Sequence, residues 1–248
     1  MNFMTDARDR VSILERALRQ IFGGRLQSLV AYGLQAAPSG APRPHAAHVE
    51  APHTQTLAIV ETLTGVDLAA CAASTARWHG AGLATPLLLA ANEFERSLDA
   101  FPLEFGAILA DHVVVAGSNP FEGLRVDPAD IRRACEVQAR SHLLHLREGF
   151  LETRGRADAL AVLIVRSAAP FAALITSLTR LQGVATNDPA ASGRHVERTL
   201  GLPAGTVTDV VKLAHVAEIS SAEATRILSG YLNAVERLVK YIDAWSAP

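Results

Sequence analysis

Residues 29–34 read Leu-Val-Ala-Tyr-Gly-Leu, and residues 54–60 read Thr-Gln-Thr-Leu-Ala-Ile-Val. Both stretches are short runs of apolar residues, which are typical of buried strands. The first run ends at Gly33, a residue that suits a tight turn. We therefore predict a strand over 29–32, a glycine turn, a long connection and a second strand over 57–60. This pair of strands decides the fold.

The rest of the first half alternates between helices and strands. Val11, Leu14 and Leu18 lie on one stripe of an opening helix, which Gly23 and Gly24 end. After the second strand the pattern predicts a helix over 66–78, a strand over 86–89, a short helix from Asn92, and strands over 101–109 and 112–116. This order predicts a small mixed-sheet domain.

The second half has the pattern of a helical bundle. Asp127 suits a helix N-cap and Pro128 suits the first helical turn. Helices are predicted at 128–151, 156–182, 191–200, 207–217 and 221–243, the second one with Pro170 inside it. The predicted fold class is α+β, with a mixed-sheet domain at 1–126 and an all-α bundle domain at 127–248.

Composition narrows the functional classes. The chain has 248 residues and a net charge of −2, so it has no strong positive field that would attract nucleic acid. Nucleic acid is therefore not expected as a partner. The apolar stretch at 160–178 is interrupted by Arg166 and Pro170, whereas a membrane span needs about 20 apolar residues. We therefore expect no membrane association and a cytoplasmic location. Cys71 and Cys135 stand alone, which argues against a disulfide scaffold.

The strand, the turn at Gly33 and the second strand resemble the core of the nucleotidyltransferase superfamily, the fold of kanamycin nucleotidyltransferase and polymerase β. Residues 98–105, 112–117 and 144–148 resemble a bacterial group of nucleotidyltransferase-domain proteins. The resemblance covers about the first 150 residues. In this superfamily a Gly-Ser turn cradles the triphosphate, and an Asp-x-Asp on the next strand holds two magnesium ions.

The residues of this chain depart from that pattern. Gly33 matches the glycine, but Leu34 replaces the serine, and Thr54 and Thr56 replace the two aspartates. Neutral hydroxyls are poor Mg²⁺ ligands. Glu104 occupies the place of the third carboxylate in the predicted strand. The resemblance thus implies a degenerate, non-catalytic protein with no metal or cofactor, in which Gly33, Thr54 and Thr56 are the nucleotide-binding candidates and Glu104 is a residual acid.

Two enzymatic alternatives stay open. In the first, Glu104 joins Asp67 or Glu61 in a rearranged, Mg²⁺-dependent transfer site. The competing expectations are that Asp67 is a first-turn helix charge and that Glu104 pairs with an arginine. In the second, Arg140 and His145 resemble the Arg-x4-6-His signature of HEPN ribonucleases, which would make this an RNA-processing protein. A solvated helix face is the simpler interpretation.

Partners are less constrained. The apolar face over 227–242 predicts either packing within the bundle or a homodimer through the C-terminal helices. A nucleotide or a protein partner is expected. The connection at 34–53 is rich in proline and is expected to be mobile beside the nucleotide site. Its residues His45, His48 and His53 could bind zinc or nickel only in a rigid site, so no metal is expected.

Overall fold

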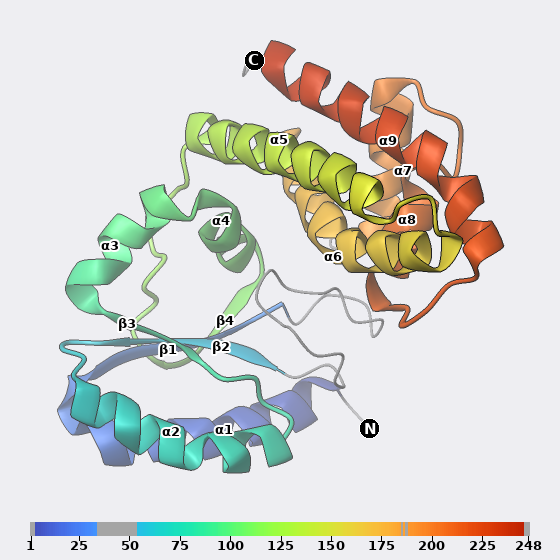
Figure 1. The fold of residues 1–248 in the computed structure, drawn as a ribbon. Coiled ribbons are helices and arrows are strands. Elements are labelled where there is room, and N and C mark those ends of the chain that lie inside the picture. The colour runs from blue at the N-terminus through green and yellow to red at the C-terminus, as the bar shows by residue number, and fades with distance from the viewer. Residues whose placement is uncertain (1–2, 34–53, 185, 187, 246–248) are drawn as a thin grey trace. The chain divides into compact units, whose positions relative to one another are not determined.

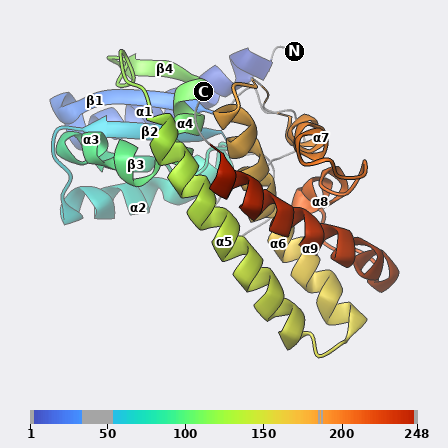
Figure 2. The ribbon, with the colours of Figure 1, turned by 90° about the horizontal axis from the view of Figure 1, so that it is seen from above.

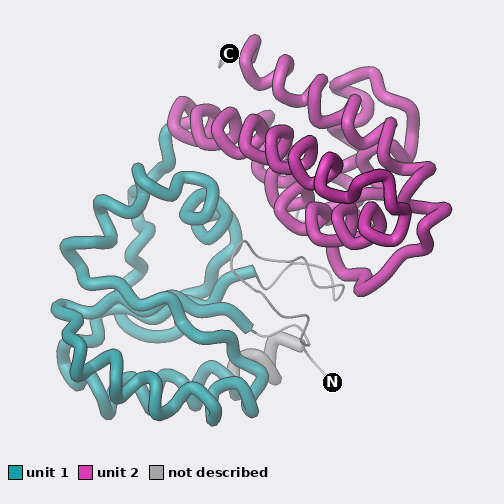
Figure 3. The backbone as a smooth tube through the Cα atoms, in the orientation of Figure 1, with its two compact units in different colours: residues 1–35, 50–127 teal, residues 36–49, 128–248 magenta. Residues whose placement is uncertain are grey.

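The computed structural model describes residues 3–33, 54–184, 186 and 188–245, with the side chains of the first helix described from Arg10 onward. These residues form two compact units, which divide between Asp127 and Pro128 (Figure 3). The predicted mobile connection at 34–53 and its histidines lie outside the described residues.

Unit 1 has the predicted α+β architecture. Its elements are α1 (Phe3–Phe22), the 3-10 turn η1 (Gly23–Arg25), β1 (Leu26–Tyr32), β2 (Gln55–Val60), α2 (Gly65–Gly80), β3 (Leu87–Ala90), α3 (Ala91–Ala100), α4 (Pro102–Ala110) and β4 (His112–Gly117). The four strands form one sheet in the order β3-β2-β1-β4. Strand β1 is antiparallel to both β2 and β4, whereas β2 and β3 are parallel. The sheet is therefore mixed, as predicted.

Helices cover both faces of this sheet, with α1 and α2 on one face and α3 and α4 on the other (Figure 1). Side chains of a strand alternate between faces. The strand residues packed in the α1/α2 layer include Leu29, Ala31, Ala58 and Val60. Those packed in the α3/α4 layer are Val30, Leu57 and Ile59. Each face thus has its own apolar core, and the strands are buried on both sides.

The predicted strand over 101–109 is wrong, because this segment forms α4. Pro102 stands at the first helical position, where its fixed backbone angle favours a helix. The buried residues Pro102, Phe105 and Ile108 recur every three positions and form one face of the helix. The segment is so uniformly apolar that its sequence does not separate a buried helix from a buried strand.

Unit 2 is a helical bundle whose helices match the predicted ones closely. They are α5 (Pro128–Glu152), α6 (Ala157–Leu181), α7 (Pro189–Leu200), α8 (Thr208–Lys212) with the 3-10 turn η2 (Leu213–His215), and α9 (Ser221–Ala244). Helices α5, α6 and α9 pack side by side (Figures 1 and 2). At their centre the ring of Phe171 lies 4.9 Å from that of Tyr231 and 5.4 Å from that of His142.

Helix α6 is the central element of the bundle. By length and composition it could cross a membrane, with a mean hydropathy of 1.9. It contacts α5, α7, α8 and α9, and its buried residues include Ile164, Phe171 and Leu178. The same apolar composition is what a core helix of a bundle requires.

The apolar face of α9 is also buried inside the bundle. Tyr231, Val235, Leu238 and Ile242 are each at most 1% exposed. A homodimer through this face would have to displace the bundle's own packing. Residues of the 227–242 face thus pack within the bundle, and a homodimer through the C-terminal helices stays a prediction.

Candidate functional site

The candidate nucleotide-binding residues gather where β1 ends and β2 begins, an edge of the sheet that we call the glycine end. The N–H of Gly33 donates to the carbonyl of Asp111 at 3.1 Å, and Gly33 has a φ of 66°, which favours glycine. Tyr32 pairs with Gln55 on one side and with His112 on the other. The predicted proximity of Gly33 to the start of β2 is therefore present.

Thr54 and Thr56 lie at this end, the first held by backbone hydrogen bonds and the second buried. The N–H of Thr54 donates to the carbonyl of Gly82, and its own carbonyl accepts from Ala84, both at 2.9 Å. Thr56 is 1% exposed. Its hydroxyl has no hydrogen-bond partner among the described residues. Thr56 is thus a buried polar side chain in an apolar layer.

The strand alternation shows which layer this is. Ala58 and Val60 pack against α1 and α2, and Thr56 lies on the same face of β2. Trp78 of α2 belongs to this layer, and its indole N–H is a second buried donor without a partner in the described part of the chain. A triphosphate with its metal needs several anionic ligands, and the residues packed in this layer that the structure describes are mostly apolar.

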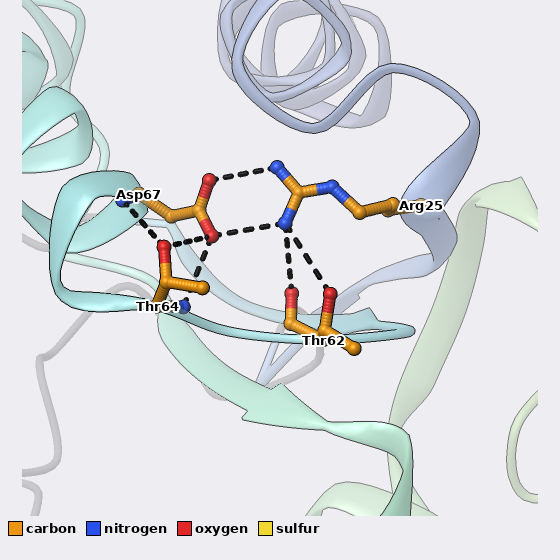
Figure 4. Close-up of polar contacts among 4 residues, drawn as sticks. All are labelled: Arg25, Thr62, Thr64 and Asp67. Atoms are coloured by element: carbon orange, nitrogen blue, oxygen red, sulfur yellow. Dashed lines mark hydrogen bonds and ion pairs between the residues drawn. The ribbon is translucent and has the colours of Figure 1, made fainter.

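Asp67 lies at the opposite end of the sheet, where β1 begins and β2 ends. Its two carboxylate oxygens accept from Arg25 at 2.7 and 2.9 Å, a bidentate pair (Figure 4). It also closes a capping box with Thr64 at the start of α2. The hydrogen bonds from Arg25 and then Thr64 hold the pKa of Asp67 far below its usual range. The expectation that Asp67 is a first-turn helix charge is confirmed.

Glu104 does not occupy the place predicted for it. It lies in the first turn of α4, half-buried, rather than in the middle of a strand. Its side chain has no ion pair or hydrogen bond with any described residue, so the expected arginine partner is absent there. Because α4 and α2 cover opposite faces of the sheet, Glu104 and Asp67 do not converge. Glu61 is exposed, and its N–H donates to the carbonyl of Arg25 at the end far from Gly33.

Comparison with known proteins shows a similarity of fold. No family model matches the chain, and no curated protein matches it. A solved structure of a spectinomycin adenyltransferase from Enterococcus faecialis, determined with ATP and spectinomycin, is similar with a TM-score of 0.55. The identity is 10%, and the match covers 95% of this chain and 98% of that one. The chain has a nucleotidyltransferase-like fold.

The hydroxyls of Thr54 and Thr56 are not the ligands that Mg²⁺ prefers. Mg²⁺ prefers carboxylate and phosphate oxygens in octahedral geometry. Thr54 and Thr56, which the sequence resemblance sets at the two aspartates, offer only hydroxyls. Within the described ranges, no group of three or more His, Cys, Asp or Glu side chains could hold a metal ion.

Asp111 and His112 at the glycine end were missed by the sequence analysis. Asp111 is 6% exposed, and it precedes β4 directly beside Gly33. The ring of His112 has its Nδ1 3.1 Å from the carbonyl of Leu109 and its Nε2 3.2 Å from Oδ1 of Asn119. The sequence signal was the pair Asp-His before an apolar strand, but only the pairing of β4 with β1 brings it to Gly33.

The Arg-x4-6-His signature of α5 does not form one site. Arg140 donates to Asp243 of α9 at 2.8 Å and to Glu136 at 3.3 Å. His145 contacts Glu148 at 3.2 Å. The side chains of Arg140 and His145 are 53% and 75% exposed. They take part in separate surface pairs, which agrees with a solvated helix face rather than with an RNA-cleaving centre.

Proposed function

We propose that this protein is a non-catalytic member of the nucleotidyltransferase-like proteins, whose sheet unit binds or docks a partner instead of transferring a nucleotide. The observation that carries the proposal is Thr56. It replaces a carboxylate of the superfamily pattern and is buried in the α1/α2 layer with no polar partner among the described residues.

The physical argument concerns charge. Metal-dependent nucleotidyl transfer relies on paired carboxylates that hold cations against the triphosphate and the attacking oxygen. Asp111 at the glycine end is a single carboxylate where this chemistry needs a pair, and the other acids weighed as replacements lie elsewhere in unit 1. Asp67 is neutralised by Arg25, and Glu104 lies on α4 at the other face of the sheet. A neutral hydroxyl cannot substitute for either charge.

The experiment follows release of pyrophosphate from ATP, CTP, GTP and UTP in the presence of Mg²⁺. We expect no release above that from heat-denatured protein, and the variant Glu104→Gln should behave as the unmodified chain does. Mg²⁺-dependent release that Glu104→Gln abolishes, with the melting temperature unchanged, would instead support an active, rearranged site.

A further inference from the structure

Helix α5 presents a line of large apolar side chains to solvent. Val137, Leu144 and Leu151 are 64%, 63% and 74% exposed. They recur every seven residues, which is close to two helical turns, so they lie along one side of the helix. We call these three residues the α5 strip. A regular line of exposed large apolar residues is typical of an interaction surface.

Opposite charges border the strip. Arg133 lies four residues before Val137, and Glu148 lies four residues after Leu144. Their side chains are 72% and 73% exposed. Among the described residues each has a local partner on the same helix, Asp130 for Arg133 and His145 for Glu148, both at 3.2 Å. Such exposed pairs contribute little and exchange readily.

The arginines on the side of the helix that faces α9 do not cover the strip. Arg140 is drawn to Asp243 at 2.8 Å, and Arg147 is drawn to Glu236 at 2.7 Å. Both acids belong to α9. These two ion pairs hold the long side chains toward the bundle and leave the strip accessible.

We propose that the α5 strip packs against the α5 strip of a second copy of this chain, with the two helices antiparallel. A two-fold axis between residues 140 and 141 places Val137 opposite Leu144 of the other copy, and these two residues form the apolar contact. Leu151 lies at its end, opposite Asp130 of the other copy. The same axis places Arg133 opposite Glu148 of the other copy. Each of these contacts occurs twice, because a two-fold interface is self-complementary.

The charges select this direction. A parallel pair would set Arg133 against Arg133 and Glu148 against Glu148, and like charges at such contacts are destabilising. In the antiparallel pair Arg133 of each copy lies opposite Glu148 of the other, so both contacts are attractive. This surface lies outside the sheet unit, so the proposal is independent of whether unit 1 binds a nucleotide.

The expected dimer is weak. From Val137 to Leu151 the strip spans about 21 Å of helix, at 1.5 Å per residue. Two helices in contact over that length bury less surface than a stable dimer, whose interface buries roughly 1,200 Å² or more. We therefore expect a reversible dimer that is detected at about 100 µM protein rather than at nanomolar concentration.

Cysteine cross-linking tests the register. The variants Val137→Cys and Leu144→Cys are oxidised alone and as a mixture, with the unmodified chain as the control for the buried Cys71 and Cys135. We expect a cross-linked dimer from the mixture in several-fold excess over either variant alone. Equal or greater cross-linking of Val137→Cys with itself would overturn the antiparallel arrangement.

Sedimentation tests the dimer itself. The unmodified chain should approach the dimer mass as its concentration rises, and Leu144→Glu should remain a monomer with an unchanged circular dichroism spectrum. The matched control is Val162→Glu on α6, which also replaces a half-exposed apolar residue but lies outside the strip. Its association should equal that of the unmodified chain. A monomer mass for the unmodified chain across this range, or equal loss of association in both variants, would overturn the proposal.

Discussion

Replacing Thr56 with valine removes one hydroxyl and keeps the shape of the side chain. The hydroxyl is buried at 1% exposure without a partner among the described residues. It loses its hydrogen bonds to water on folding and gains none in return. Valine carries a methyl group at the same place, which the surrounding apolar layer of α1 and α2 accommodates.

The magnitude follows from the cost of burying an unpaired hydroxyl. That cost is about 1–3 kcal/mol. Thr56→Val should therefore raise the free energy of unfolding of unit 1 by about 1 kcal/mol or more. In a chain of this size 1 kcal/mol corresponds to a melting temperature about 2–4 °C higher. Thr56→Asp should do the reverse, because it buries an unpaired carboxylate.

Urea unfolding monitored by circular dichroism measures the change, with Thr64→Val as the matched control. The hydroxyl of Thr64 donates to Asp67 at 2.7 Å and caps α2, so its loss should cost about 1 kcal/mol. The same substitution thus has opposite signs at the two positions. If Thr56→Val destabilises the protein as Thr64→Val does, the hydroxyl of Thr56 has a polar partner and our description of this layer is wrong.

Two further predictions concern charge. Asp67→Asn should lower the melting temperature, since it removes the anion that Arg25 pairs with. Glu15→Gln, which breaks an exposed pair on one helix, should leave the melting temperature unchanged. Equal effects of the two substitutions would contradict the structural role of Asp67. Burial and then the nearby His145 lower the pKa of His142 to about 4. The unfolded chain therefore binds this proton first, and stability should fall by about 3 kcal/mol between pH 6.5 and pH 4. Urea unfolding of His142→Gln should lack that loss, and an unchanged pH profile would refute the assignment.

The helices and the central strands could be predicted from the sequence because their apolar periodicity is local. The bundle helices and strands β1, β2 and β4 follow from apolar spacing and from end signals such as Pro128 and Gly33. The prediction of a strand over 101–109 was wrong because an almost continuous apolar run has no period that separates a helix from a strand. Glu104 therefore lies in a helix on one face of the sheet and not in a strand, where it was predicted.

The candidate site was predictable only in part. The proximity of Gly33 to Thr54 follows from two consecutive strands that pair. Asp111 reaches the same end through the pairing of β4 with β1, which joins segments about eighty residues apart and leaves no local pattern. The apolar face of α9 was visible in the sequence, but a stripe does not specify whether its own bundle or a second copy covers it.

The most direct test of the central claim is calorimetric titration of the full chain with ATP, CTP, GTP and UTP, each with and without Mg²⁺. With Thr54 and Thr56 in place of the two carboxylates, we predict no Mg²⁺-dependent heat of binding for any of the four nucleotides. Saturable binding that appears only with Mg²⁺ would contradict the claim that the nucleotidyltransferase-like sheet of this protein has lost its metal-dependent site.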